Sequence, residues 1–183
     1  MKRIEILVGA AALALAGCAT SGTSGDATGN APAAGTASAD IRDAAGQARA
    51  RATASEAGDS VRIRVEAAGL AQGAYGVHVH TTGRCDPPDF ASAGPHWNPT
   101  GQQHGKDNPH GMHRGDLPNL LVGTDGRGSF EYTIRGATLG AGPNPVLDAD
   151  GAAVVVHAKA DDLRTDPSGN SGARIACGVL RPD

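Results

Sequence analysis

The sequence predicts an all-β domain of the sandwich or barrel type. Residues 61–66 alternate strictly between apolar and charged side chains, and residues 130–134 alternate between apolar and polar ones. Both patterns are typical of half-buried antiparallel strands. Asp125-Gly126 and Asp150-Gly151 are hairpin-turn signals. No stretch of the domain keeps a helical period, so many short strands joined by turns are expected.

The amino-terminal segment has the order of an export signal. Lys2 and Arg3 precede an apolar run over residues 6–16, which is too short to span a bilayer. Leu15-Ala16-Gly17-Cys18 resembles the cleavage box of bacterial lipoproteins, in which Cys18 carries the lipid. Residues 1–18 are therefore predicted to be a lipoprotein signal peptide. The alternative is an ordinary signal cut near Gly17, with Cys18 incidental.

Residues 19–40 consist largely of Ala, Gly, Ser and Thr and contain almost no large apolar side chain. Such a segment buries too little surface to offset its ordering entropy, so it is predicted to be a flexible, disordered tether. Residues 41–183 then form one domain of ordinary size. We expect an exported protein, lipid-anchored to the cell envelope in the periplasm. The residue after Cys18 is Ala19, so the acidic signal that retains lipoproteins in the inner membrane is missing, and this favours the outer membrane.

Charge and cysteine content narrow the partners and the compartment. The formal net charge is −3, which does not favour nucleic acid as a partner. Three cysteines are present, and if Cys18 carries lipid, Cys85 and Cys177 remain as a pair. An exported protein permits a disulfide between them. The alternative is two separate buried thiols.

Residues 48–54 alternate Ala with Arg or Thr and predict a weaker strand. Two further strands, over residues 77–80 and 154–156, are expected to carry histidines. In a strand over residues 77–80, His78 and His80 share one face, while the two valines point to the core. Residues 154–156 read as a buried strand that ends in His157.

A Gly- and Pro-rich segment over residues 94–116 is expected to be a long loop with a metal site. It holds four histidines, His96, His104, His110 and His113, and is closed by the carboxylate of Asp116. Three His and one Asp form a suitable tetrahedral set for zinc. The strand residues His78, His80 and His157 add three more imidazoles, and four His around one ion would suit copper(II). The alternative is a solvated, His-rich loop.

Five motifs in order resemble those of the copper–zinc superoxide dismutases over about residues 41–182. They are Gly76-Val77-His78-Val79-His80, Ala93-Gly94-Pro95-His96-Trp97-Asn98-Pro99, His113-Arg114-Gly115-Asp116-Leu117, Val155-Val156-His157-Ala158 and Gly169-Asn170-Ser171-Gly172-Ala173-Arg174-Ile175-Ala176-Cys177-Gly178-Val179. The resemblance implies an eight-stranded antiparallel Greek-key β-barrel, with the metals outside it beneath two long functional loops.

The resemblance also implies the site residues, with one copper and one zinc per chain. The copper ligands would be His78, His80, His96 and His157, and the zinc ligands His96, His104, His113 and Asp116. Asp161 would hydrogen-bond ligands of both metals, the alternative being a surface carboxylate. Arg174 would lie beside copper and share the catalytic role with His96; its alternative is a solvated Arg on a strand edge.

The activity implied is conversion of superoxide to dioxygen and hydrogen peroxide by redox cycling of copper, with zinc supporting the bridging His96. It would protect the cell envelope, as a monomer or homodimer. Two rival functions are a non-enzymatic metal-binding module and a structural surface lipoprotein that uses zinc for stability. Tyr75, Trp97, the extra His110 and the short loop over residues 162–172 depart from the family pattern.

Overall fold

The computed structural model describes residues 35–183, and its fold is almost entirely β-sheet. The predicted signal peptide, Cys18 and residues 19–34 of the predicted tether lie outside the described residues. Within residues 35–183, no helix has the length and apolar character of a membrane span. The strands are β1 (Thr36–Asp43), β2 (Ala48–Ala57), β3 (Ser60–Ala68), β4 (Gly73–Tyr75), β5 (Val77–His80), β6 (Leu120–Val122), β7 (Arg127–Arg135), β8 (Ala152–His157) and β9 (Arg174–Pro182), with one short 3-10 turn, η1 (Ala91–Ala93).

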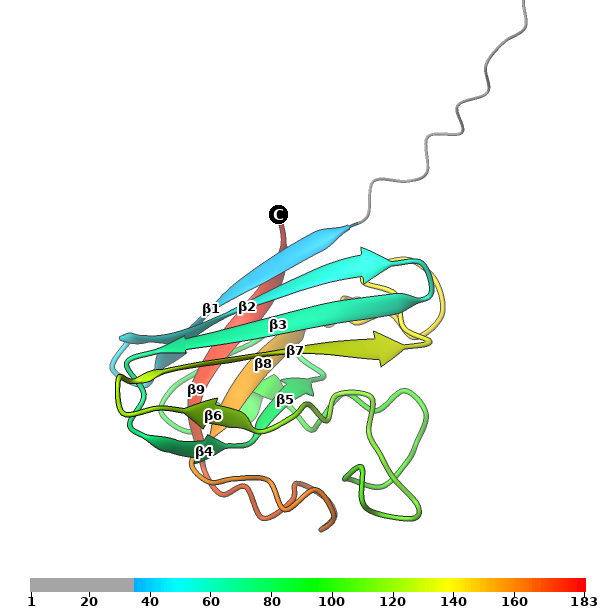
Figure 1. Ribbon diagram of the computed structural model, residues 1–183. Coiled ribbons are helices and arrows are strands. Elements are labelled where there is room, and N and C mark those ends of the chain that lie inside the picture. Colours follow the sequence, from blue (N-terminus) through cyan, green and yellow to red (C-terminus); the bar gives the residue numbers. More distant parts are fainter. Residues whose placement is uncertain (1–34) are drawn as a thin grey trace, which may run out of the picture. The chain divides into compact units, whose positions relative to one another are not determined.

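Seven strands form one curled antiparallel sheet in the order β5-β8-β9-β1-β2-β3-β7, and β4 pairs with β6. Strands β1, β2, β3 and β7 lie in front of β9, β8 and β5 in Figure 1. Only Gly76 separates β4 from β5, so these two are halves of one bent strand. Counted in this way, the described part of the chain has eight strands, and the predicted fold class is confirmed.

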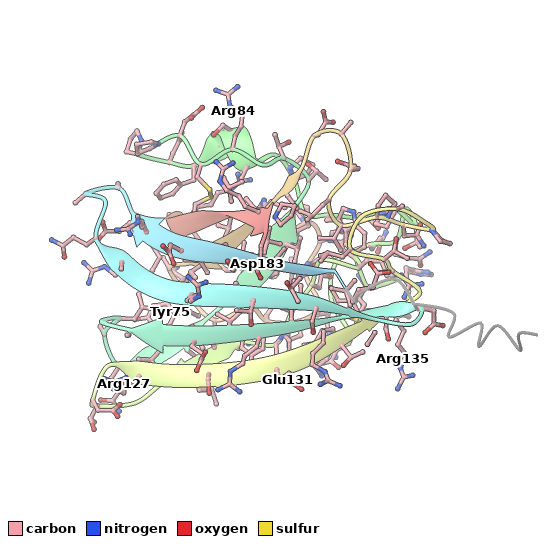
Figure 2. All side chains as sticks on the ribbon, turned by 90° about the horizontal axis from the view of Figure 1, so that it is seen from above. Tyr75, Arg84, Arg127, Glu131, Arg135 and Asp183 are labelled. Atoms are coloured by element: carbon pink, nitrogen blue, oxygen red, sulfur yellow. A yellow bond between two sulfur atoms is a disulfide. The ribbon has the colours of Figure 1, made fainter. Side chains whose placement is uncertain are left out.

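The core is built from the inward face of each strand. On β3 the predicted residues Val61, Ile63 and Val65 are fully buried. On β7 the apolar face is only partly buried at Phe130 and Tyr132, because β7 is the edge strand of the sheet. The charged residues of the other face project outward along β7 in Figure 2, where Arg127, Glu131 and Arg135 are labelled.

The predicted boundary of the tether at residue 40 is wrong, because β1 already begins at Thr36. Residues 36–41 pair with Ser55–Ala50 of β2, and the other edge of β1 pairs with β9. Ala37, Ala39 and Ile41 point inward and are buried. Alanine is small, but on a central strand its methyl group and its ladder hydrogen bonds are enough to include the segment in the barrel.

Of the two predicted hairpin turns, the one at Asp125-Gly126 is confirmed and the one at Asp150-Gly151 is wrong. Asp125-Gly126 lies in the tight connection between β6 and β7, where the Gly123 N–H donates to the Arg127 carbonyl at 2.9 Å. Asp150-Gly151 does form a turn, but it ends the long connection from β7 and leads directly into β8. A turn signal alone does not say which strands the turn joins.

Candidate metal centre

The first long loop, residues 81–119, runs back along the edge of β5 that β8 leaves free. The Trp97 N–H donates to the Val79 carbonyl at 2.8 Å, and the Val79 N–H donates to the Gly115 carbonyl at 2.9 Å. These bonds place His96 opposite His80, and a second bridge places Asp116 opposite His78. Gly115 is required here, because a Cβ atom would collide with the Val79 carbonyl oxygen.

Three histidines beside this loop each use one ring nitrogen and leave the other buried without a partner. The partnered atoms are His78 Nε2 with Asp161 Oδ2 at 2.7 Å, His80 Nδ1 with the Gly94 carbonyl at 2.8 Å, and His157 Nδ1 with the Gly172 carbonyl at 3.2 Å. The unpartnered atoms are His78 Nδ1, His80 Nε2 and His157 Nε2.

Unpartnered buried nitrogens are costly in a protein interior, so this cluster fits a bound cation. Ligand atoms of His78, His80, His96 and His157 lie within 4.8 Å of one another. Burial lowers the pKa of His78 to about 3, of His80 to about 2 and of His157 to about 4. The rings are therefore neutral at neutral pH, as metal ligands must be. Four imidazole nitrogens suit copper(II).

Next to this group, three imidazoles converge on one carboxylate oxygen. Asp116 Oδ1 lies 3.0 Å from His96 Nδ1, 2.9 Å from His104 Nδ1 and 3.2 Å from His113 Nδ1. Its other oxygen accepts the backbone N–H groups of Gly105 and His113. Hydrogen bonds from these groups hold the pKa of Asp116 far below its usual range despite burial. Three nitrogens and a carboxylate suit tetrahedral zinc.

The two groups share residues, so two ions would be neighbours. A second compact set of ligand atoms within 4.8 Å joins His78, His96, His104 and Asp116. His113 is outside that set, but its Nδ1 atom lies 3.4 Å from His96 Nδ1 as well as beside Asp116. His78 and His96 belong to both sets, and of these two rings only His96 also contacts Asp116.

Asp161 connects the two groups through its two oxygens. Oδ2 contacts His78, and Oδ1 lies 3.0 Å from His104 Nε2. Burial disfavours the charged form of His104, yet its hydrogen bonds to Asp116 and Asp161 prevail and raise its pKa to about 9. Gly169 leaves the room for this bridge, since a Cβ atom there would collide with Asp161 Oδ1.

Arg174 is held by backbone carbonyls beside the group of four histidines that would suit copper, namely His78, His80, His96 and His157. Its guanidinium donates to the Phe90 carbonyl and to the Gly94 carbonyl, both at 2.7 Å. The Gly94 carbonyl is also the partner of His80, so one oxygen connects Arg174 to a candidate ligand. Burial lowers the pKa of Arg174, but a guanidinium remains charged in proteins.

The predicted Cys85–Cys177 disulfide is confirmed, with Cα atoms 5.6 Å apart. It joins the first loop to β9 close to Phe90 and Arg174.

The sequence did not predict that the backbone carbonyls of Gly94 and Gly172 contact His80 and His157. Backbone acceptors leave no side-chain signal in a sequence.

Three residues that depart from the family pattern, His110, Trp97 and Tyr75, lie outside both groups of candidate metal ligands. His110 is exposed and belongs to neither compact group. Trp97 is buried in the core, and the Tyr75 hydroxyl donates to the Ala71 carbonyl at 2.9 Å.

Comparison with known proteins agrees with this geometry. A family model described as copper/zinc superoxide dismutase matches residues 44–180. The superoxide dismutase-like protein YojM of Bacillus subtilis is 46% identical over 124 residues, which cover 67% of this chain and 63% of that protein. A copper–zinc superoxide dismutase of Aquifex aeolicus is 40% identical over 147 residues, covering 78% of this chain and 86% of that protein.

Solved structures show the same fold. The crystal structure of a superoxide dismutase-like protein from Bacillus subtilis matches with a TM-score of 0.74 and 40% identity, covering 79% of this chain and 97% of that chain. A double mutant of such a protein from the same organism matches with a TM-score of 0.74 and 42% identity, covering 78% and 95%. By sequence, fold and the two adjacent His-rich groups, the chain belongs to the copper/zinc superoxide dismutase family.

Proposed function

We propose that this superoxide dismutase works in the cell envelope, exported by residues 1–18 and anchored through a lipid on Cys18, in the outer membrane. The order of basic, apolar and small residues before Cys18 supports export. The Cys85–Cys177 disulfide also supports it, because such bonds persist in oxidising compartments such as the periplasm. There the enzyme would protect the envelope from superoxide.

The observation that carries the activity is the set of three unpartnered buried nitrogens around His96. In this proposal His78, His80, His96 and His157 hold copper, which supplies one-electron redox chemistry when bound. Zinc is held by His96, His104, His113 and Asp116, and Asp161 orients a ring in each set.

The chain's own residues then have two tasks at the reacting centre. Arg174 places a permanent positive charge next to His80 and can hydrogen-bond an anion such as superoxide. The Nδ1 atom of His96 contacts Asp116. Its Nε2 atom would then be available to bind copper together with His78, His80 and His157, or to hold a proton. The disulfide and the carbonyls of Phe90 and Gly94 keep Arg174 in this place.

The activity is tested by metal analysis together with superoxide decay measured by pulse radiolysis on the mature chain. We expect one copper and one zinc per chain and fast removal of superoxide. Copper loading without superoxide removal would instead favour a non-enzymatic metal-binding module. Zinc uptake without copper would favour a structural lipoprotein.

The location is tested separately by labelling cells with a radioactive fatty acid and fractionating the membranes. The wild type should carry the label and sediment with the outer membrane, whereas Cys18→Ala should be unlabelled. An unlabelled wild type in the soluble periplasm would contradict the anchor and leave the dismutase activity unaffected.

A further inference from the structure

In the second long loop, residues 158–173, the part after Asp161 is fastened to the first loop beside His104 by three hydrogen bonds. The Leu163 carbonyl accepts the Asp107 N–H at 2.9 Å, and the Arg164 carbonyl accepts the Asn108 side-chain amide at 3.2 Å. Asp166 Oδ1 accepts the backbone N–H of His104 at 2.7 Å. In Figure 1 the second loop, in orange, and part of the first loop, in green, both lie below the strands.

The backbones of the two loops touch directly at this place. Gly105 has a positive φ of +98°, and a Cβ atom on it would collide with the Leu163 carbonyl. Gly105 also donates its N–H to Asp116 Oδ2 at 2.9 Å. A shift of the second loop therefore acts on the first loop at the residue that follows His104.

Asp166 is the acidic residue of this contact that reaches two of the three residues whose imidazoles converge, His104 through its backbone and His113 through its ring. Besides the His104 N–H, its Oδ1 atom lies 3.9 Å from His113 Nε2. That distance is too long for a direct hydrogen bond and suits a bridging water. Within residues 35–183, no direct hydrogen bond to His113 Nε2 is present, while His113 Nδ1 faces Asp116. Asp166 and His113 also line one open pocket.

We infer that Asp166 is a positioning residue for zinc. It is not a ligand; it fixes the backbone of His104 and the outer edge of His113, so that both Nδ1 atoms stay aimed at the position beside Asp116. Carboxylates that hold ligating imidazoles typically change metal affinity about 10–100-fold when removed. The inference rests on the zinc site proposed above, and it assigns a share of zinc affinity to a loop that supplies no zinc ligand.

The test measures the zinc dissociation constant of the mature, copper-loaded chain by competition with a chromophoric chelator. Asp166→Ala should weaken zinc binding by about tenfold or more. Asp166→Asn should fall between the wild type and Asp166→Ala, because its amide oxygen can still accept the His104 N–H but carries no charge. Asp148→Asn is the matched control: Asp148 lines the same pocket, and its Oδ1 accepts only the Asp150 N–H.

Two further readouts separate positioning from a general loss of structure. Cobalt(II) placed in the zinc site should show altered visible absorption bands in Asp166→Ala and unaltered bands in Asp148→Asn. The melting temperature of the metal-free chain should be nearly the same in all variants. Zinc affinity of Asp166→Ala within twofold of wild type would overturn the inference, and so would an equal loss in Asp148→Asn. If Asp166→Ala does not fold, unchanged zinc affinity and unchanged cobalt bands in Asp166→Asn would overturn it. None of these results depends on the rate of superoxide removal.

Discussion

Removing the Cys85–Cys177 bridge should lower both stability and activity. The bridge spans a sequence separation of 92 residues, and the loop-closure entropy for that length corresponds to about 4.6 kcal/mol at room temperature. The double variant Cys85→Ala/Cys177→Ala should lose about that much unfolding free energy. It also releases the segment that carries the Phe90 and Gly94 carbonyls, so the guanidinium of Arg174 loses its fixed position.

The assay is urea unfolding of the metal-free chain in the presence of a chelator, since metal binding to the native state would add its own stabilisation. A reductant should destabilise the wild type by about the same amount and leave the double variant unchanged. Pulse radiolysis of the metal-loaded double variant should show slower superoxide decay. A stability loss below about 1 kcal/mol would refute the loop-closure reasoning. Full activity after removal of the bridge would refute its role in holding Arg174.

Four further predictions concern the site and the first strand. Arg174→Ala should keep both metals and slow superoxide decay about tenfold or more, with a weaker salt dependence in pulse radiolysis. His110→Ala should leave zinc content unchanged in metal analysis, whereas His113→Ala should lower it, because of these two histidines only His113 lies beside Asp116. Zinc must displace the proton that His104 holds below about pH 9, so apparent zinc affinity measured by chelator competition should fall about tenfold per pH unit as pH falls below that value. Deleting residues 36–40 in addition to the preceding segment should lower the melting temperature by about 5 °C or more in calorimetry, because β1 is lost.

Each of these has a contradicting result. A fully metallated Arg174→Glu as fast as the wild type at low salt would remove Arg174 from substrate capture. Loss of zinc in His110→Ala but not in His113→Ala would show that the loop assignment is wrong. Zinc affinity that does not change with pH would contradict proton displacement from His104. An unchanged melting temperature after deletion of residues 36–40 would place the start of the fold beyond them.

Strands with large apolar residues could be predicted from the sequence, and so could the histidines on them. The alternation of Val61, Ile63 and Val65 identifies β3 because only a strand puts these residues on one face. The start of β1 cannot be recognised in the sequence up to residue 40, because Ala37 and Ala39 resemble tether residues and only their pairing with β2 and β9 makes them part of the sheet.

Contacts between distant loops could not be predicted where neither a family motif nor a cysteine pair indicates them. Asp166 and His104 are 62 residues apart, and their hydrogen bond exists only because the second loop folds back over the first. The same holds for the carbonyl of Gly94, which orients His80 through its backbone rather than its side chain. Motifs identify the residue types a site needs, but the atoms that orient those residues depend on the path of the chain.

The bridge made by Asp161 has a thermodynamic consequence. Its two oxygens hold His78 in one group and His104 in the other, so fixing either ring restricts the carboxylate that the other ring needs. With copper in the first group and zinc in the second, as proposed, their binding is coupled, and the coupling is reciprocal: whatever factor zinc contributes to copper affinity, copper contributes to zinc affinity. The order of loading would therefore not alter the total binding free energy, and a chain already holding zinc would bind copper with an affinity changed by that factor.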